Sequence, residues 1–168
     1  MKRRLFLLSG TAAVVATKLH ATEGTFEITR TEAQWRAQLS EIEYLVMREE
    51  KTERAGSSPL DKETRDGIYA CRGCDLPLYD ASTKYDSGTG WPSFYQPLPN
   101  AVRTKDDNTF FSKRTEVHCR RCGSHLGHIF DDGPKPTGKR HCLNGVSLTF
   151  QIAQTEDASA WRSRPPEV

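Results

Sequence analysis

The chain of 168 residues is long enough for one domain of ordinary size, and its 36% apolar and 27% charged residues indicate a folded protein. It contains no run of 18 apolar residues, so the sequence predicts no membrane-spanning helix. Most of the basic excess lies in residues 1–21; the rest carries 20 basic and 22 acidic side chains, a net charge of −2 that argues against nucleic-acid binding.

Residues 1–21 are typical of an export signal. A basic start precedes the short apolar stretch LFLLSGTAAVVA, and Leu19-His20-Ala21 offers a small residue at a cleavage point. The pair Arg3-Arg4 before that stretch favours a twin-arginine signal, which carries folded cargo, over a general secretory signal. We therefore expect a single mature domain of residues 22–168 in a bacterial periplasm.

Two capping boxes predict helix starts in the mature chain, one formed by Thr31 and Gln34 and one by Ser40 and Glu43. They predict two short helices over residues 31–38 and 41–51, with one bent helix as the alternative. The composition of residues 54–66 is that of a loop. The apolar residues at helical spacing, which should face the core, are Trp35, Leu39, Ile42 and Val46.

From residue 67 onward, short apolar pieces separated by Gly, Pro, Asn and Asp predict antiparallel strands. The clearest strand covers residues 146–152, where apolar and polar side chains alternate. Residues 131–139 should form a rigid loop, and the polar tail from residue 154 should be frayed. The fold class we expect is mainly β with short N-terminal helices.

Four of the five cysteines form two C-x-x-C turns, Cys71 with Cys74 and Cys119 with Cys122. Each turn brings two thiolates together, and two such turns complete a closed four-thiolate metal site. We favour one structural zinc ion, although thiolates alone do not distinguish zinc from iron. Two structural disulfides, or a redox-active C-x-x-C, are the alternatives in an exported protein.

Cys142 is left without a partner in this scheme, which indicates a reactive thiol. If residues 140–152 are extended, Arg140, Cys142 and Asn144 lie on one face, unless Gly145 makes a bulge. A guanidinium beside the thiol would favour the thiolate. The alternative is that Cys142 is a small buried hydrophobic residue.

Four segments together resemble the B-type peptide-methionine sulfoxide reductases, which act on the R epimer of the sulfoxide. The stretch YLVMREEKTER at residues 44–54 is also similar to this family, so the resemblance covers most of the mature domain. The four segments are CRGCDLPLY (71–79), SGTGWPSFY (87–95), EVHCRRCGSHLGHIFDDGP (116–134) and GKRHCLNGVSLTF (138–150).

The resemblance implies two small antiparallel sheets around a catalytic Cys142, with zinc bound by Cys71, Cys74, Cys119 and Cys122. It implies a monomeric enzyme that acts on oxidised proteins or peptides and uses a thiol reductant protein. The further catalytic residues that it implies are His125, His128, Arg140 and Asn144. The substrate-binding residues that it implies are Trp91, which would hold the methyl group, Phe130 and Asp132.

The chemistry that follows is attack of the Cys142 thiolate on the sulfoxide sulfur, which leaves methionine and a cysteine sulfenic acid. His125 or His128 would supply or position the proton for the oxygen, although residues three apart lie on opposite faces of a regular strand. The chain departs from the family pattern at His141, where Tyr is frequent, and at Thr89, where many members have a resolving cysteine. We therefore expect an external thiol, thioredoxin-like or other, to reduce Cys142.

Two other functions compete with this interpretation. One is a non-enzymatic zinc module that binds a protein partner; the other is a general thiol–disulfide oxidoreductase that uses a C-x-x-C. The basic pairs Lys113-Arg114 and Arg120-Arg121 are expected to be solvated charges.

Overall fold

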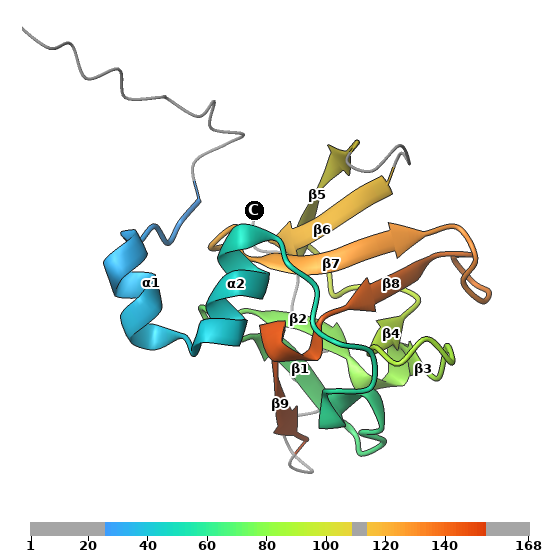
Figure 1. The fold of residues 1–168 in the computed structure, drawn as a ribbon. Coiled ribbons are helices and arrows are strands. Elements are labelled where there is room, and N and C mark those ends of the chain that lie inside the picture. The colour runs from blue at the N-terminus through green and yellow to red at the C-terminus, as the bar shows by residue number, and fades with distance from the viewer. Residues whose placement is uncertain (1–25, 109–113, 154–168) are drawn as a thin grey trace, which may run out of the picture.

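A computed structural model describes residues 26–108 and 114–153, so the predicted export signal and the polar tail lie outside the described residues. The described chain is mainly β, as the sequence predicts, and contains two antiparallel sheets, as the resemblance implies (Figure 1). Strands β2-β1-β9 form a three-stranded sheet, and β3-β4-β8-β7-β6-β5 form a six-stranded sheet. No helix in this part of the chain is long and apolar enough to cross a membrane.

The helices are α1 (Glu32–Gln38) and α2 (Glu41–Glu49). The strands are β1 (Gly67–Cys71), β2 (Pro77–Asp80), β3 (Lys84–Tyr85), β4 (Ser93–Phe94), β5 (Val102–Asp107), β6 (Arg114–Cys119), β7 (His125–Phe130), β8 (Arg140–Leu143) and β9 (Leu148–Ile152).

The two helices begin where the capping boxes predict. The hydroxyls of Thr31 and Ser40 accept hydrogen bonds from the backbone N–H groups of Gln34 and Glu43, respectively. Because Ser40 caps the start of a second helix, this segment forms two helices and not one bent helix. Helix α2 ends two residues earlier than predicted because Glu50 adopts a left-handed conformation with φ of 56°.

The prediction of which helical residues face the core is wrong at one position. Trp35, Leu39 and Val46 are buried, whereas Ile42 is 46% exposed. The predicted spacing runs without a break through both helices, but the new cap starts a second helix axis after Leu39. The helical phase therefore restarts, and Ile42 turns outward.

The chain passes from one sheet to the other between β8 and β9, so residues 140–152 are not one extended segment, and the break falls at Gly145, where a bulge was the alternative. A single 3₁₀ turn over Gly145–Ser147 separates the strands, and the predicted strand starts at Leu148 instead of 146. Glu53 causes this break, because its backbone N–H donates to the Asn144 side chain at 3.0 Å and its carboxylate accepts from the Gly145 N–H.

The core lies between the sheets and beneath α2. Tyr79 packs on Phe94 with ring centroids 4.6 Å apart, and Tyr69 packs on the same ring at 4.9 Å. His141 points into this core, where its Nδ1 lies 3.0 Å from the Tyr79 hydroxyl, and burial lowers its pKa to about 4. The histidine that precedes Cys142 is thus a core residue on the opposite face of β8 from the cysteine.

Candidate functional site

The four paired cysteines converge between the two sheets. Cys71 ends β1 and Cys119 ends β6, and each is followed by a tight turn that holds the second cysteine. All four sulfur atoms lie within 4.8 Å of one another. The sulfur atoms of Cys71 and Cys122 are 3.7 Å apart, and those of Cys74 and Cys119 are 3.5 Å apart.

These distances fit a metal site better than disulfides. Sulfur atoms bound at about 2.3 Å to one tetrahedral ion lie about 3.8 Å apart, whereas disulfide sulfur atoms lie about 2.0 Å apart. The four cysteines are therefore positioned to bind one metal ion and could hold zinc. With four protein ligands, such a site has no open position for a substrate.

The residues around the C-x-x-C turn at 119–122 explain why a glycine follows this turn. Gly123 has a φ of 68°, and a Cβ at this position would lie 2.4 Å from the ring of Phe26. On the other side, Arg48 of α2 donates to the Cys122 carbonyl oxygen at 3.2 Å and stacks over Trp35 of α1. The helices and the N-terminal segment thus cover the metal-binding turns.

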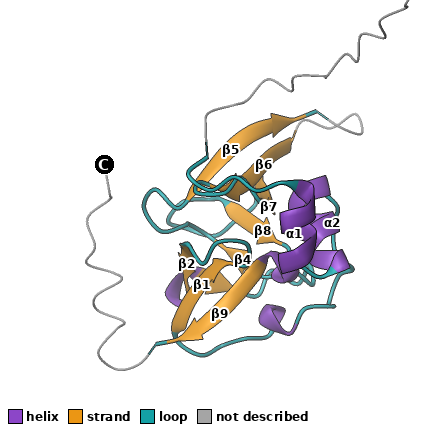
Figure 2. Ribbon diagram, turned by 90° about the vertical axis from the view of Figure 1, so that its left-hand side faces the viewer, coloured by secondary structure: helices purple, strands orange, loops and turns teal. Residues whose placement is uncertain are grey.

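Cys142 lies on β8, which runs between β4 and β7 in the six-stranded sheet (Figure 2). It pairs with Ser93 on β4 and with His128 on β7; His128 pairs with Glu116 on β6, which pairs with Lys105 on β5, so these residues form a row across the sheet. Directly paired residues of antiparallel strands project from the same face. The register alone therefore brings the thiol, an imidazole, a carboxylate and an ammonium group to one face of the sheet.

A β-bulge at Leu126 brings both predicted histidines to that face. Val117 pairs with Gly127, but the next residue of β6, His118, pairs with His125, so Leu126 is an extra residue in β7. The extra residue reverses the alternation, and the rings of His125 and His128 meet edge to face at 5.4 Å. In a regular strand without the bulge, the two rings would lie on opposite faces of the sheet.

The two histidines have different surroundings. His125 is 2% exposed; its Nδ1 lies 2.7 Å from a Glu116 carboxylate oxygen, and burial lowers its pKa to about 4. Its Nε2 is buried and has no hydrogen-bond partner among the described residues. His128 is half-buried, and its Nε2 lies 2.9 Å from Asp107; burial lowers its pKa, and the hydrogen bond to Asp107 opposes that effect. Both rings are thus predominantly neutral at pH 7.

Charged groups on β5 and β6 support these histidines, and the sequence did not reveal them. Lys105 forms an ion pair with Glu116 at 2.9 Å, and Arg114 forms one with Asp107 at 2.7 Å. Arg114, predicted as a solvated charge, instead also lines the cavity beside Cys142. Charged residues are common in a strand that has one solvent-exposed face, so the sequence does not indicate which of them point toward a site.

A cavity of about 170 Å³ opens at Cys142. Of the predicted residues, Trp91, His128, Phe130, Cys142 and Asn144 line it, whereas His125 lies behind His128 and does not. A Cβ at Gly127 would lie 2.0 Å from the Cys142 carbonyl oxygen, so this glycine lets the two strands approach beneath the cavity. The other residues that line the cavity are Thr52, Arg114, Gly127 and Leu143.

Arg140 and Asp132 form a bidentate ion pair beside the cavity. The Nε and Nη2 atoms of Arg140 each lie 2.8 Å from an oxygen of Asp132, and the guanidinium carbon lies 4.3 Å from the ring centroid of Phe130. Asp132 is 62% exposed and Arg140 12% exposed. The resemblance-based assignments of Arg140, Phe130 and Asp132 thus fall on one contiguous group.

Burial raises the pKa of the Cys142 thiol above its usual value. The Thr89 hydroxyl, the Arg140 guanidinium and the Ser93 hydroxyl act in the opposite direction, in that order of size. The Arg140 guanidinium therefore lowers the pKa of Cys142, as expected, but burial raises it by more.

Glu53 connects the two sides of the cavity, and sequence reasoning missed it. Its carbonyl oxygen accepts from Trp91 Nε1 at 3.2 Å, and its N–H donates to the Asn144 side chain. Asn144 in turn donates from Nδ2 to the Leu126 carbonyl oxygen at 3.1 Å, so both ends of its amide are bonded to backbone. Asn144 is thus arranged to hold the turn after Cys142. A buried Glu in a loop carries no local signal of such a role.

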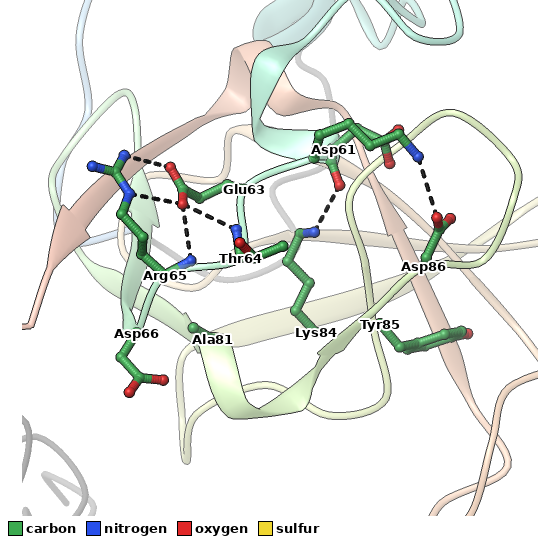
Figure 3. Close-up of a pocket in the computed structure, with 10 residues that line it drawn as sticks. Asp61, Glu63, Thr64, Arg65, Asp66, Ala81, Lys84, Tyr85 and Asp86 are labelled. Atoms are coloured by element: carbon green, nitrogen blue, oxygen red, sulfur yellow. Dashed lines mark hydrogen bonds and ion pairs between the residues drawn. The ribbon is translucent and has the colours of Figure 1, made fainter.

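A second cavity, of about 260 Å³, is lined in part by Tyr85 and contains none of the predicted residues. Its three basic side chains are bonded within it: Arg65 to Glu63 at 2.6 Å, Lys62 to Asp86 at 3.2 Å, and Lys84 to the Asp61 carbonyl oxygen at 2.7 Å (Figure 3). The cavity at Cys142 is therefore the better candidate for catalysis.

Known proteins are similar to this chain over most of its length. The family model described as the SelR domain matches residues 39–152. The protein named "Peptide methionine sulfoxide reductase MsrB" of Thiobacillus denitrificans is 52% identical over 122 residues, which cover 72% of this chain and 92% of that protein.

Two relatives from other kingdoms are similarly close. A protein of the same name from Methanosarcina mazei is 49% identical over 74% of this chain and 89% of its own length. "Peptide methionine sulfoxide reductase B1, chloroplastic" of Arabidopsis thaliana is 50% identical over 76% of this chain and 64% of its own length.

Proposed function

This chain belongs to the SelR family of B-type peptide methionine sulfoxide reductases, and we propose that it reduces methionine-R-sulfoxide in proteins and peptides with Cys142 as nucleophile. The observation that carries this proposal is the cavity in which the metal-free thiol of Cys142 lies with the His128 imidazole and the Trp91 indole.

In this mechanism the Cys142 thiolate attacks the sulfoxide sulfur. The thiolate forms a bond to the substrate sulfur while the sulfoxide oxygen takes up one proton. The sulfur–oxygen bond of the substrate and this transient sulfur–sulfur bond then break, and the oxygen ends as a hydroxyl on the Cys142 sulfur, so that the products are methionine and a sulfenic acid on Cys142. Substrate sulfur is reduced and cysteine sulfur is oxidised by the same two electrons.

His128 is our candidate for directing the proton to the sulfoxide oxygen. It lines the cavity, and its hydrogen bond to Asp107 fixes the ring orientation. In the neutral ring the one N–H is donated from Nε2 to Asp107, so Nδ1 is an acceptor that can hold a water molecule hydrogen-bonded to the sulfoxide oxygen; a protonated ring would donate to the oxygen from Nδ1. His125, held by Glu116 behind it, would position the His128 ring by contact.

Trp91 and the polar wall opposite it explain the choice of epimer. The indole is fixed by its bond to the Glu53 carbonyl oxygen and offers an apolar surface for the S-methyl group. The sulfoxide oxygen must then face the His128 side. Inverting the sulfur exchanges the oxygen with a carbon substituent and leaves polar groups without a partner.

The test is activity on the two separated epimers of a methionine-sulfoxide peptide, with a dithiol reductant. We expect the R epimer to be reduced at least about 100-fold faster than the S epimer, since the wrong epimer loses buried hydrogen bonds. Equal rates, or a preference for the S epimer, would contradict the proposal. The Trp91→Ala variant should lose much of the discrimination.

The four remaining cysteines would bind a structural zinc ion and leave no thiol to resolve the Cys142 sulfenic acid. Many family members carry a resolving cysteine at the position of Thr89. In this chain the Oγ1 atom of Thr89 lies 3.9 Å from Cys142 Sγ. We therefore propose that an external thiol, on a thioredoxin-like protein or another reductant, regenerates Cys142.

Mass spectrometry after a single turnover without reductant checks the recycling route. We expect Cys142 to gain one oxygen atom, trapped by a sulfenic-acid reagent, with no internal disulfide. Peptides linking Cys142 to one of the other four cysteines would contradict it. The Thr89→Cys variant is the matched control and should form such a link with position 142.

We also propose that the protein acts outside the cytoplasm on exported proteins. The twin-arginine-like segment before residue 22 supports this, because export of folded cargo would let thiolates bind metal before they meet an oxidising compartment.

A further inference from the structure

Three hydroxyl groups form a hydrogen-bonded chain that ends on the catalytic thiol. Thr89 Oγ1 lies 3.9 Å from Cys142 Sγ, and Ser87 Oγ lies 2.8 Å from Thr89 Oγ1. Ser87 Oγ also lies 2.7 Å from Ser93 Oγ, which lies 3.1 Å from the Trp91 carbonyl oxygen. Ser93 is fully buried, so it must find its partners within the protein.

The number of protons in this chain depends on the state of Cys142. Its four contacts each need one proton, and the three hydroxyls supply three. With Cys142 as a thiol, all four contacts are satisfied when donation runs from sulfur through Thr89, Ser87 and Ser93 to the Trp91 carbonyl oxygen. When the thiol loses its proton, one contact has to be given up.

We propose that Thr89, Ser87 and Ser93 are positioning residues that form a reversible hydroxyl relay, which turns its direction of donation toward Cys142 when the thiolate forms. In the thiolate state Ser93 donates to Ser87, Ser87 to Thr89, and Thr89 to sulfur. The thiol proton leaves to solvent, and the hydroxyls rotate without gaining or losing a proton. The contact given up is the neutral one to the Trp91 carbonyl oxygen, since a thiolate is the stronger acceptor.

The relay works within a defined charged environment. Arg140 on β8 is the cation that favours the thiolate, and Tyr85 on β3 adds a neutral phenol in range of both. His128 on β7 and Arg114 on β6 face the same cavity as the thiol. Burial raises the pKa of Cys142, and the Thr89 hydroxyl is the largest of the influences that lower it, ahead of Arg140 and Ser93, so loss of that hydroxyl should reduce the amount of thiolate at neutral pH.

The experiment measures the pH dependence of Cys142 alkylation by iodoacetamide in the metal-loaded protein, read by mass spectrometry of the Cys142 peptide. Thr89→Val should raise the pKa of Cys142 by about one, and so slow alkylation at pH 7 by about tenfold. Thr89→Ser, which keeps the hydroxyl, should behave like the unmodified protein. Ser82→Ala removes an exposed hydroxyl outside the relay and should change nothing.

Ser87 separates a relay from a single hydrogen bond, because its hydroxyl is bonded to those of Thr89 and Ser93 and reaches the sulfur only through them. Ser87→Ala should raise the pKa of Cys142 by a smaller amount than Thr89→Val. Combined with Thr89→Val it should add less than its separate effect, since part of that effect passes through Thr89 and the rest through Ser93. An unchanged pKa in Ser87→Ala, or full additivity in the double variant, would overturn the relay, as would a Thr89→Ser variant that matches Thr89→Val.

This inference rests on the proposed role of Cys142 as nucleophile, but its measurement uses no sulfoxide. If the unmodified protein failed to reduce either epimer, the proposed function would fail while the alkylation profiles would still decide on the relay. If the enzyme were active and the profiles were unchanged in Thr89→Val, the relay alone would fail.

Discussion

Replacing Cys142 by serine is expected to abolish sulfoxide reduction, with a loss of at least about 10⁴-fold, while the fold survives. A serine hydroxyl at neutral pH is a far weaker nucleophile than a thiolate, and the described structure offers no base that contacts position 142 closely enough to activate it. Turnover of a methionine-R-sulfoxide peptide with excess dithiol measures the effect.

The stability of this variant is the necessary control. Cys142 is half-buried at a cavity wall and lies outside the metal-binding cluster, so serine should cost little in packing and leave the metal content unchanged. Thermal unfolding and metal content should therefore match those of the unmodified protein. Residual activity close to normal would mean that another thiol does the chemistry, as the general thiol–disulfide oxidoreductase hypothesis requires; an unmodified protein without activity would favour the zinc module.

Removing the metal ligands is expected to unfold the domain or nearly so. Cys119→Ser should reduce the free energy of unfolding by about 5 kcal/mol or more, which for a domain of this size lowers Tm by about 15–25 °C. The reason is that the cluster joins the β1–β2 turn of one sheet to the β6–β7 turn of the other. Without an ion, four thiols crowd one another at the point where α1 and α2 pack.

The pair Cys119→Ser and Cys142→Ser is matched, because each replaces one sulfur atom by oxygen. Only the first should lose bound zinc, counted per chain by elemental analysis, and only the first should melt early. Addition of a strong chelator to the unmodified protein under reducing conditions should reproduce its melting curve. A chelated protein that kept its Tm would show that the cluster holds no structural ion.

Local sequence signals predicted the parts of the fold that local interactions determine. The capping boxes at Thr31 and Ser40 gave both helix starts, because a cap is made by residues three positions apart. The C-x-x-C spacing predicted the metal-binding cluster for a similar reason, since each pair is formed within one turn.

Features that depend on distant contacts were not predictable in this way. The break between β8 and β9 is set by Glu53, which is about 90 positions from its partners Asn144 and Gly145. The bulge at Leu126 depends on pairing with β6, so alternation alone left open whether His125 and His128 share a face. The resemblance named these histidines, but it did not reveal the supporting Glu116, Lys105 and Asp107.

The position of the nucleophile within its sheet has a consequence for how such enzymes diverge. The backbone of Cys142 is paired on both sides, with β4 and with β7, whereas Ser87, Thr89 and Trp91 approach it from the turn before β4. Sequence changes in that turn can alter how the oxidised Cys142 is reduced, without moving strand β8, which positions its sulfur. Lineages facing different cellular electron donors can therefore adapt one short segment and inherit the remaining architecture unchanged.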